Sequence, residues 1–177
     1  MMLNERHFTQ MAAYFLQKRG GRMSHLKLMK LLYLADRESL RLHGLSISGD
    51  CLVSMTLNLM DGDVESSSDG WESLISTKEN HELALKTVLQ PDALDELSKA
   101  DTDILESIWN QFGKLSRWEI RDYTHQHCPE WEDPHGSSKP IRFEKLFQTL
   151  GHSTEEAKRL AEHIDEQQHI DELFAAL

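Results

Sequence analysis

The stretch that decides the fold runs from His25 to Met55 and reads HLKLMKLLYLADRESLRLHG, followed by LSISGDCLVSM. Its first part repeats apolar residues at helical spacing, which predicts a helix from Ser24 to about His43 with Gly44 as its stop. The stripe is too wide for a surface helix, so we expect this helix at the centre of the core. Its members are Leu28, Leu31, Leu32, Ala35 and Leu42. Residues Ile47–Met55 favour a short extended segment.

The remaining elements are predicted from their start and stop signals. A helix over residues 4–19 ends at a glycine pair. Three more helices are predicted to begin at serines. At two of them, Ser116 and Ser153, we predict a capping box, in which the serine and an acidic residue three positions later satisfy each other's backbone N–H groups. These helices start at Ser98, Ser116 and Ser153 and run to about Phe112, His125 and His169. Residues 143–150 predict a short helix, and residues 81–88 fit a strand or a helix.

These elements predict a mainly α (α+β) fold, a single compact helical domain over residues 1–177 with a small β-strand or hairpin element. At the end of the chain, Leu173, Phe174 and Leu177 have helical spacing. We expect these last turns to pack on the core, with a partner-binding helix as the alternative.

The net charge of −11 is unevenly distributed. Residues 1–43 carry eight Lys or Arg against three Asp or Glu, a net +5, whereas residues 44–177 carry eleven against twenty-seven, a net −16. An acidic chain argues against a nucleic acid partner, although the basic N-terminal helices leave a DNA-binding autoregulator as an alternative. There is no apolar run of about 18 residues and no signal peptide. We expect Cys51 and Cys128 to be reduced thiols. Together these features predict a cytoplasmic protein, and the absence of an apolar run predicts no membrane partner.

No set of residues predicts a catalytic centre, and no phosphate-binding glycine loop is present. The only cluster of zinc-type donors is His125, His127, Cys128 and His135. Its spacing matches no common structural zinc pattern. We therefore predict no catalytic residue, no metal site and no cofactor. A metal-dependent hydrolase centred on the three histidines stays as a lesser alternative.

The four tryptophans divide into two pairs. Trp109 and Trp118 lie inside predicted helices and are expected in the core. Trp71 and Trp131 lie in or directly after polar loops, where a large amphipathic ring either anchors the loop or contacts a partner.

Several motifs, taken in order, resemble the Panacea domain, the SocA-like antitoxin domain of prokaryotic toxin–antitoxin systems and of phage-associated proteins. The resemblance starts with KLMKLLYLAD at Lys27–Asp36 and ISGD at Ile47–Asp50. It continues through Asp63–Trp71, Leu97-Ser98, Ile104-Leu105, Trp109, Trp118–His125, Pro129–Trp131 and Asp133-Pro134. After Met55, about eight family positions are missing, so we predict a break or distortion between Ser54 and Leu57, where linked Cα atoms must lie about 3.8 Å apart.

The resemblance implies an antitoxin that neutralises a cognate toxin by direct protein–protein binding. In the SocA branch it also implies an adaptor that delivers the toxin to a Clp-type protease. Neither role needs an enzyme's active site. We predict partner contacts beside the two polar loops, at Met55, Asn58, Asp61, Ser67 and Trp71 and at Trp131, Asp133, His135 and Ser137. The alternative is a phage- or mobile-element-encoded regulator that binds another host protein.

Overall fold

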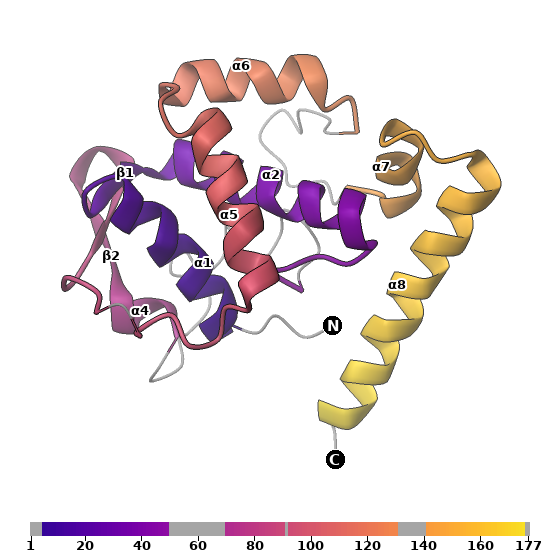
Figure 1. Ribbon diagram of the computed structural model, residues 1–177, viewed down its shortest axis with the longest axis horizontal. Helices are drawn as coiled ribbons and strands as arrows, with labels where there is room; N and C mark the ends of the chain where they lie inside the picture. Colours follow the sequence, from indigo (N-terminus) through magenta and orange to yellow (C-terminus); the bar gives the residue numbers. More distant parts are fainter. Residues whose placement is uncertain (1–4, 50–69, 91, 131–140, 176–177) are drawn as a thin grey trace.

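The structure is a computed structural model that describes residues 5–49, 70–90, 92–130 and 141–175. Within these ranges the fold is mainly helical with one small antiparallel sheet, which confirms the predicted mainly α (α+β) class (Figure 1). Residues 50–55 of the predicted extended segment lie outside the described residues. The predicted break between Ser54 and Leu57 lies outside them as well, so it stays a prediction.

The central helix α2 (His25–His43) has the predicted ends. The Ser24 side chain accepts a hydrogen bond from the backbone N–H of Lys27 at 3.4 Å, which satisfies a first-turn donor. At the other end, Gly44 takes a left-handed conformation with φ of 71° and donates its N–H to the carbonyl of Leu40. Glycine suits this position because it has no Cβ to clash there.

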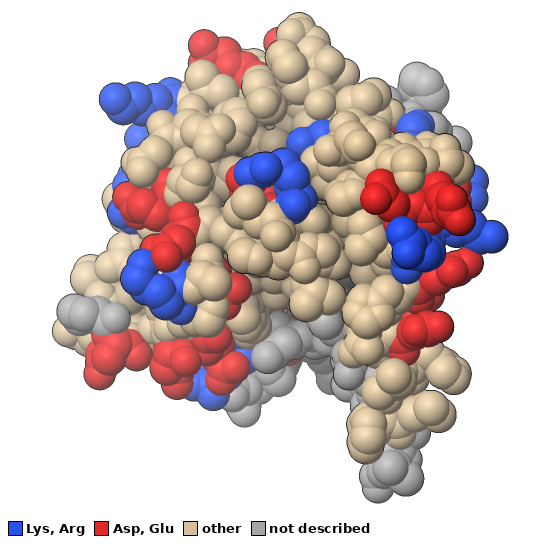
Figure 2. Space-filling view, turned by 45° about the vertical axis from the view of Figure 1, so that its right-hand side comes forward, with Lys and Arg blue, Asp and Glu red and all other residues tan. Residues whose placement is uncertain are grey.

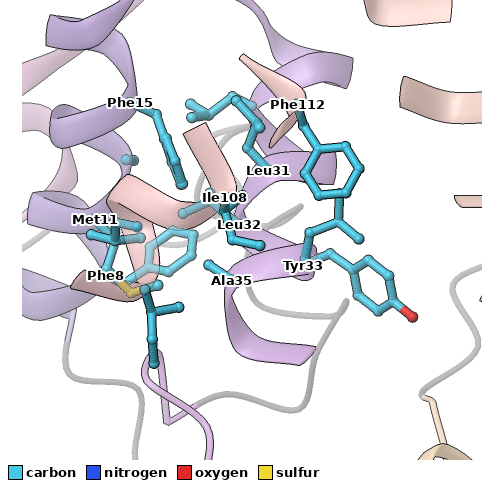
Figure 3. Packing of buried hydrophobic residues seen from close by; sticks show 14 of the residues in the cluster. Phe8, Met11, Phe15, Leu31, Leu32, Tyr33, Ala35, Ile108 and Phe112 are labelled. Carbon is cyan, nitrogen blue, oxygen red and sulfur yellow. The ribbon is translucent and has the colours of Figure 1, made fainter. Parts of the chain in front are cut away.

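Helix α2 lies at the centre of the core, as its wide apolar stripe predicts. It contacts α1 (Glu5–Lys18), α5 (Lys99–Phe112) and α6 (Arg117–His127). Figure 3 shows side chains of α1 and α5 packed around its buried face. The prediction was wrong for Leu42, which is 51% exposed because the last turn of α2 reaches the surface.

A three-stranded antiparallel sheet packs beside α1. Its strands are β1 (Arg22–Ser24), β2 (Ile75–Lys78) and β3 (Glu82–Leu85), in the order β1-β3-β2. Met23 and Thr77 both pair with Leu83. Strand β3 decides the strand-or-helix alternative at residues 81–88. A short helix, α4 (Trp71–Leu74), precedes β2, and the 3-10 turn η1 (Glu79–His81) joins β2 to β3.

The predicted extended segment does not form a strand in its described part. Ile47 and Ser48 form a bend instead, and Gly49 has no regular secondary structure. The reason is local, because the backbone and side chain of Ser48 bind the carboxylate of Asp36 on α2 rather than a neighbouring strand.

Both predicted capping boxes form, and the structure adds a third at the start of α5. Ser98 pairs with Asp101 at the start of α5, and Ser116 pairs with Glu119 at the start of α6. Ser153 exchanges the same pair of bonds with Glu156 at the start of α8 (Thr154–Ala175). The short helix α7 (Phe143–Thr149) precedes α8. Helix α8 extends beyond the predicted end near His169. None of the helices in the described ranges is both long enough and apolar enough to cross a membrane.

The end of α8 does not pack on the core. Ala157 and Ile164 on its first turns are buried against the body, mainly beside α7. Farther along, Leu173 is 57% exposed and Phe174 is 72% exposed, which contradicts the predicted packing. The helix runs away from the other described elements toward its C-terminal end, so none of those elements covers these side chains (Figure 1). Leu177 lies outside the described residues.

Candidate functional site

Several polar side chains are buried along α2. Lys27, Lys30 and Asp36 are 5%, 6% and 4% exposed. A buried charge destabilises a fold unless hydrogen bonds or other charges compensate for the lost water. Lys27 Nζ donates to the carbonyl of Gly113 at 2.6 Å, where the C-terminal end of α5 leaves acceptors unpaired. Burial lowers the pKa of Lys27, and the nearby positive charge of Arg19 adds to this effect.

The carboxylate of Asp36 holds the chain that follows α2. Its Oδ1 accepts from Ser46 Oγ at 3.0 Å and from the backbone N–H of Ser48 at 2.9 Å, and its Oδ2 accepts from Ser48 Oγ. Ser46 Oγ in turn accepts from the N–H of Gly49 at 3.2 Å. Burial raises the pKa of Asp36, while the bonds from Ser48 and Ser46 act in the opposite direction. One side chain of α2 therefore fixes residues 46–49.

A second buried cluster lies one turn away on the same helix. Tyr33 Oη donates to Glu130 Oε1, and Arg37 Nε donates to the same oxygen at 2.6 Å. The Glu130 side chain has no exposed surface, and its Oε2 has no hydrogen-bond partner among the described residues. Burial is the main cause that raises the pKa of Tyr33, which keeps its hydroxyl protonated as a donor. A buried ion pair of this kind specifies how its partners fit together more than it adds stability.

The two clusters bring distant parts of the chain to one end of α2. Asp36 binds residues 46–49, which directly precede residues 50–69, and Glu130 directly precedes residues 131–140. These two stretches contain all but one of the predicted partner contacts. Because Tyr33, Asp36 and Arg37 share adjacent turns of α2, the roots of both stretches lie on one small part of the molecule. This part of α2 is the candidate functional site.

A small, partly open hollow of about 20 Å³ lies beside the Asp36 cluster. Leu45 and Gly49 line it from the chain after α2, Phe143 lines it from α7, and Ile164 and Gln167 line it from α8. The hollow therefore extends the candidate site from α2 to α8.

Eight of the nine predicted partner contacts lie outside the described residues and stay predictions. They are Met55, Asn58, Asp61, Ser67, Trp131, Asp133, His135 and Ser137. The ninth, Trp71, is 3% exposed and stacks on Phe8 of α1 with ring centroids 5.8 Å apart. Its backbone N–H donates to Glu5 Oε1 at 2.8 Å. In this arrangement Trp71 anchors α4 to α1.

The described residues among the predicted zinc-type donors lie in different environments, two exposed and one buried. His125 and His127 are exposed on the last turn of α6, and His127 stacks on Tyr123 at 4.3 Å. Cys128 is buried near Tyr33 and Arg37, and burial raises the pKa of its thiol. His135 lies outside the described residues. Among the described residues, no three His, Cys, Asp or Glu side chains are grouped to hold a metal.

Trp109 and Trp118 differ in burial. Trp109 packs against the core beside Phe15 and Lys27. The core prediction was wrong for Trp118, which is 50% exposed on α6 with the guanidinium groups of Arg117 and Arg121 at 4.7 and 5.0 Å from its ring. Helical position alone does not tell which face of α6 is covered. Only Ile120 and Thr124 of this helix are buried.

Sequence reasoning also missed Asp36, Arg37 and Glu130 as parts of a site. One signal was available, since charged residues at Lys27, Lys30 and Asp36 interrupt the apolar stripe of a helix predicted to be central. Such residues are rarely buried unless they are paired. The partner Glu130, more than ninety positions away, had no comparable signal.

The family model described as "Antitoxin SocA-like, Panacea domain" matches residues 28–132, more than half of the chain. The chain belongs to the SocA-like antitoxin family. Its Panacea domain match begins inside α2 and ends just after Glu130, so it contains both buried clusters of the candidate site. Helices α7 and α8 lie beyond the matched residues. No curated protein and no solved structure gives a significant match to the chain.

Proposed function

We propose that this chain is the antitoxin of a toxin–antitoxin pair and neutralises a cognate toxin by binding it directly. The observation that carries the proposal is the match of the antitoxin family model over residues 28–132. Antitoxin function of this kind needs a rigid, specific surface rather than a reactive group. The buried clusters of Asp36 and Glu130 supply rigidity at the roots of the two stretches with the predicted contacts.

The physical reason concerns the entropy of binding. Ordering a loop when a partner binds costs conformational entropy, which weakens the complex. Asp36 makes three hydrogen bonds to the chain before residue 50, and Glu130 makes two to α2 just before residue 131. Both roots are thus held before any partner arrives. This supports a role in recognition for the predicted contacts on those stretches.

A growth assay tests the proposal. The product of the gene adjacent to the one encoding this chain is expressed from an inducible promoter in cells with or without this chain. We expect growth arrest by the neighbouring product alone and recovery with this chain, together with a stoichiometric complex after purification of both. Arrest that this chain does not relieve would contradict the proposal and would favour a regulator of another host protein.

Delivery of the toxin to a Clp-type protease in the cytoplasm is a further prediction of the family resemblance. The half-life of the toxin in the presence of this chain, measured with and without the protease, separates delivery from simple occlusion. A toxin that is neutralised at full lifetime in both strains is occluded. A toxin that disappears only where the protease is present is delivered.

A further inference from the structure

Helix α8 has two apolar faces that point in different directions. Ala157 and Ile164 are buried against the body, whereas Ile170, Leu173 and Phe174 are 42%, 57% and 72% exposed. At 100° per residue, the second group lies about 140° around the helix from the first. The exposed group therefore does not continue the packed face. We call Ile170, Leu173 and Phe174 the outer stripe.

Acidic residues lead into the outer stripe along the same row of the helix. Glu162, Glu166, Ile170 and Phe174 follow one another at intervals of four residues, and all four are exposed. Side chains four apart lie above one another on a helix, so these form a single ridge, acidic first and then apolar. Residues 154–175 carry seven Asp or Glu against two Lys or Arg. In Figure 2, red atoms on the projecting helix give way to tan atoms toward its end.

We propose that the outer ridge of α8 is a recognition helix for the cognate toxin and docks into an apolar groove that continues into a patch of Lys or Arg. This inference rests on the proposed function. An amphipathic helix that enters a groove uses apolar anchors at i, i+3 and i+4, as Ile170, Leu173 and Phe174 are spaced. The carboxylates of Glu162 and Glu166 select a basic rim on the partner.

A second copy of this chain fits the ridge less well than a basic partner does. Each copy has a net charge of −11, so two copies repel each other. The outer stripe exposes on the order of 300 Å², and two copies would together bury less than the roughly 1,000 Å² of a stable interface. With a toxin that also contacts the Panacea domain, the stripe need supply only part of the buried area.

The position of α8 in the chain supports a role in choosing the partner. The family match ends at residue 132, and α8 begins at Thr154. The helix thus lies outside the shared domain, and its last turns expose large apolar side chains. Large apolar side chains exposed on a helix end promote aggregation of the protein unless a partner covers them.

The test measures affinity for the product of the adjacent gene by calorimetry, with the full chain in each case. The first variant combines Leu173→Ala with Phe174→Ala, and the second combines Glu162→Lys with Glu166→Lys. Val88→Ala is the matched apolar control, because Val88 is 86% exposed away from α8. Asp165→Lys is the matched charge control, because Asp165 is exposed on the same helix about a quarter turn from the ridge.

We expect each ridge variant to raise Kd about 10- to 100-fold, with the controls within about twofold of the wild type. Thermal melting should be unchanged, because the replaced side chains are exposed. Wild-type binding that the ridge variants leave unaltered would overturn this inference while the proposed function stands. A wild-type chain that neither binds nor neutralises the product would instead refute the proposed function. A wild-type dimer in sedimentation that the double alanine variant dissolves would assign the stripe to a second copy and also overturn the inference.

Discussion

The carboxylate of Asp36 offers the sharpest test of how the candidate site is built. Replacement by alanine removes the acceptor of three hydrogen bonds, one of them from the buried backbone N–H of Ser48. Replacement by asparagine keeps an oxygen for Ser46 Oγ and Ser48 N–H, and its amide can donate to Ser48 Oγ. The two variants therefore separate the loss of the hydrogen bonds from the loss of the charge.

The magnitude follows from two opposing terms. Three hydrogen bonds to an ionised group contribute about 1.5–3 kcal/mol each, and removal of the buried charge returns several kcal/mol of desolvation. We expect Asp36→Ala to lower the free energy of unfolding by about 2–4 kcal/mol and Asp36→Asn by less than about 1 kcal/mol. For a chain of 177 residues, the loss in the alanine variant corresponds to a fall in Tm of roughly 5–15 °C.

The raised pKa of Asp36 adds a dependence on pH. Because the folded protein binds this proton more tightly than the unfolded chain does, protonation stabilises the fold. The contribution is complete below the ordinary aspartate value of 3.8 and is lost as the pH rises through the raised pKa of the folded state. The stability of the wild type relative to Asp36→Asn should therefore increase as the pH falls from neutral toward 4.

Urea denaturation followed by tryptophan fluorescence measures these differences, at pH 7 and at several lower values. The comparison with asparagine at each pH cancels the titration of other groups. Equal losses for the alanine and asparagine variants would refute the role assigned to the hydrogen bonds. A wild-type advantage that shrinks as the pH falls would refute the pKa direction.

Three further changes test other parts of the structure. Glu130→Ala should cost about 3–5 kcal/mol in urea denaturation because it leaves the charge of Arg37 buried without its partner, and a loss below about 1 kcal/mol would contradict the buried pair. Trp71→Ala should cost about 3–5 kcal/mol, whereas Trp118→Ala should cost less than about 1 kcal/mol, and similar Tm values for the two would show that their burial does not differ. Gly113→Ala should lower Tm by calorimetry because its Cβ would lie 2.5 Å from the carbonyl oxygen of Trp109, a cost of about 1–3 kcal/mol that an unchanged Tm would disprove.

The structure differs from the sequence-based expectation mainly in which helix faces are covered by another element. Trp118, inside a predicted helix, and Leu173 and Phe174, at helical spacing, were expected to be buried, but all three are exposed. Periodicity describes one helix, whereas burial needs a second element against that face. The same reasoning succeeded for α2, because its stripe is wide enough to need neighbours on several sides.

The sequence by itself determined both ends of α2, the starts of α5, α6 and α8, and the place of α2 at the centre of the core. Ser24, Gly44 and the capping boxes at Ser116 and Ser153 act within a few residues, so they can be recognised from the sequence alone. It also carried the family resemblance. Only the tertiary structure decided that Glu130 meets Tyr33 and Arg37, that the sheet joins β1 to β3, and that the end of α8 is uncovered. Those features join residues far apart in the chain, and such contacts depend on how whole elements pack rather than on any local pattern.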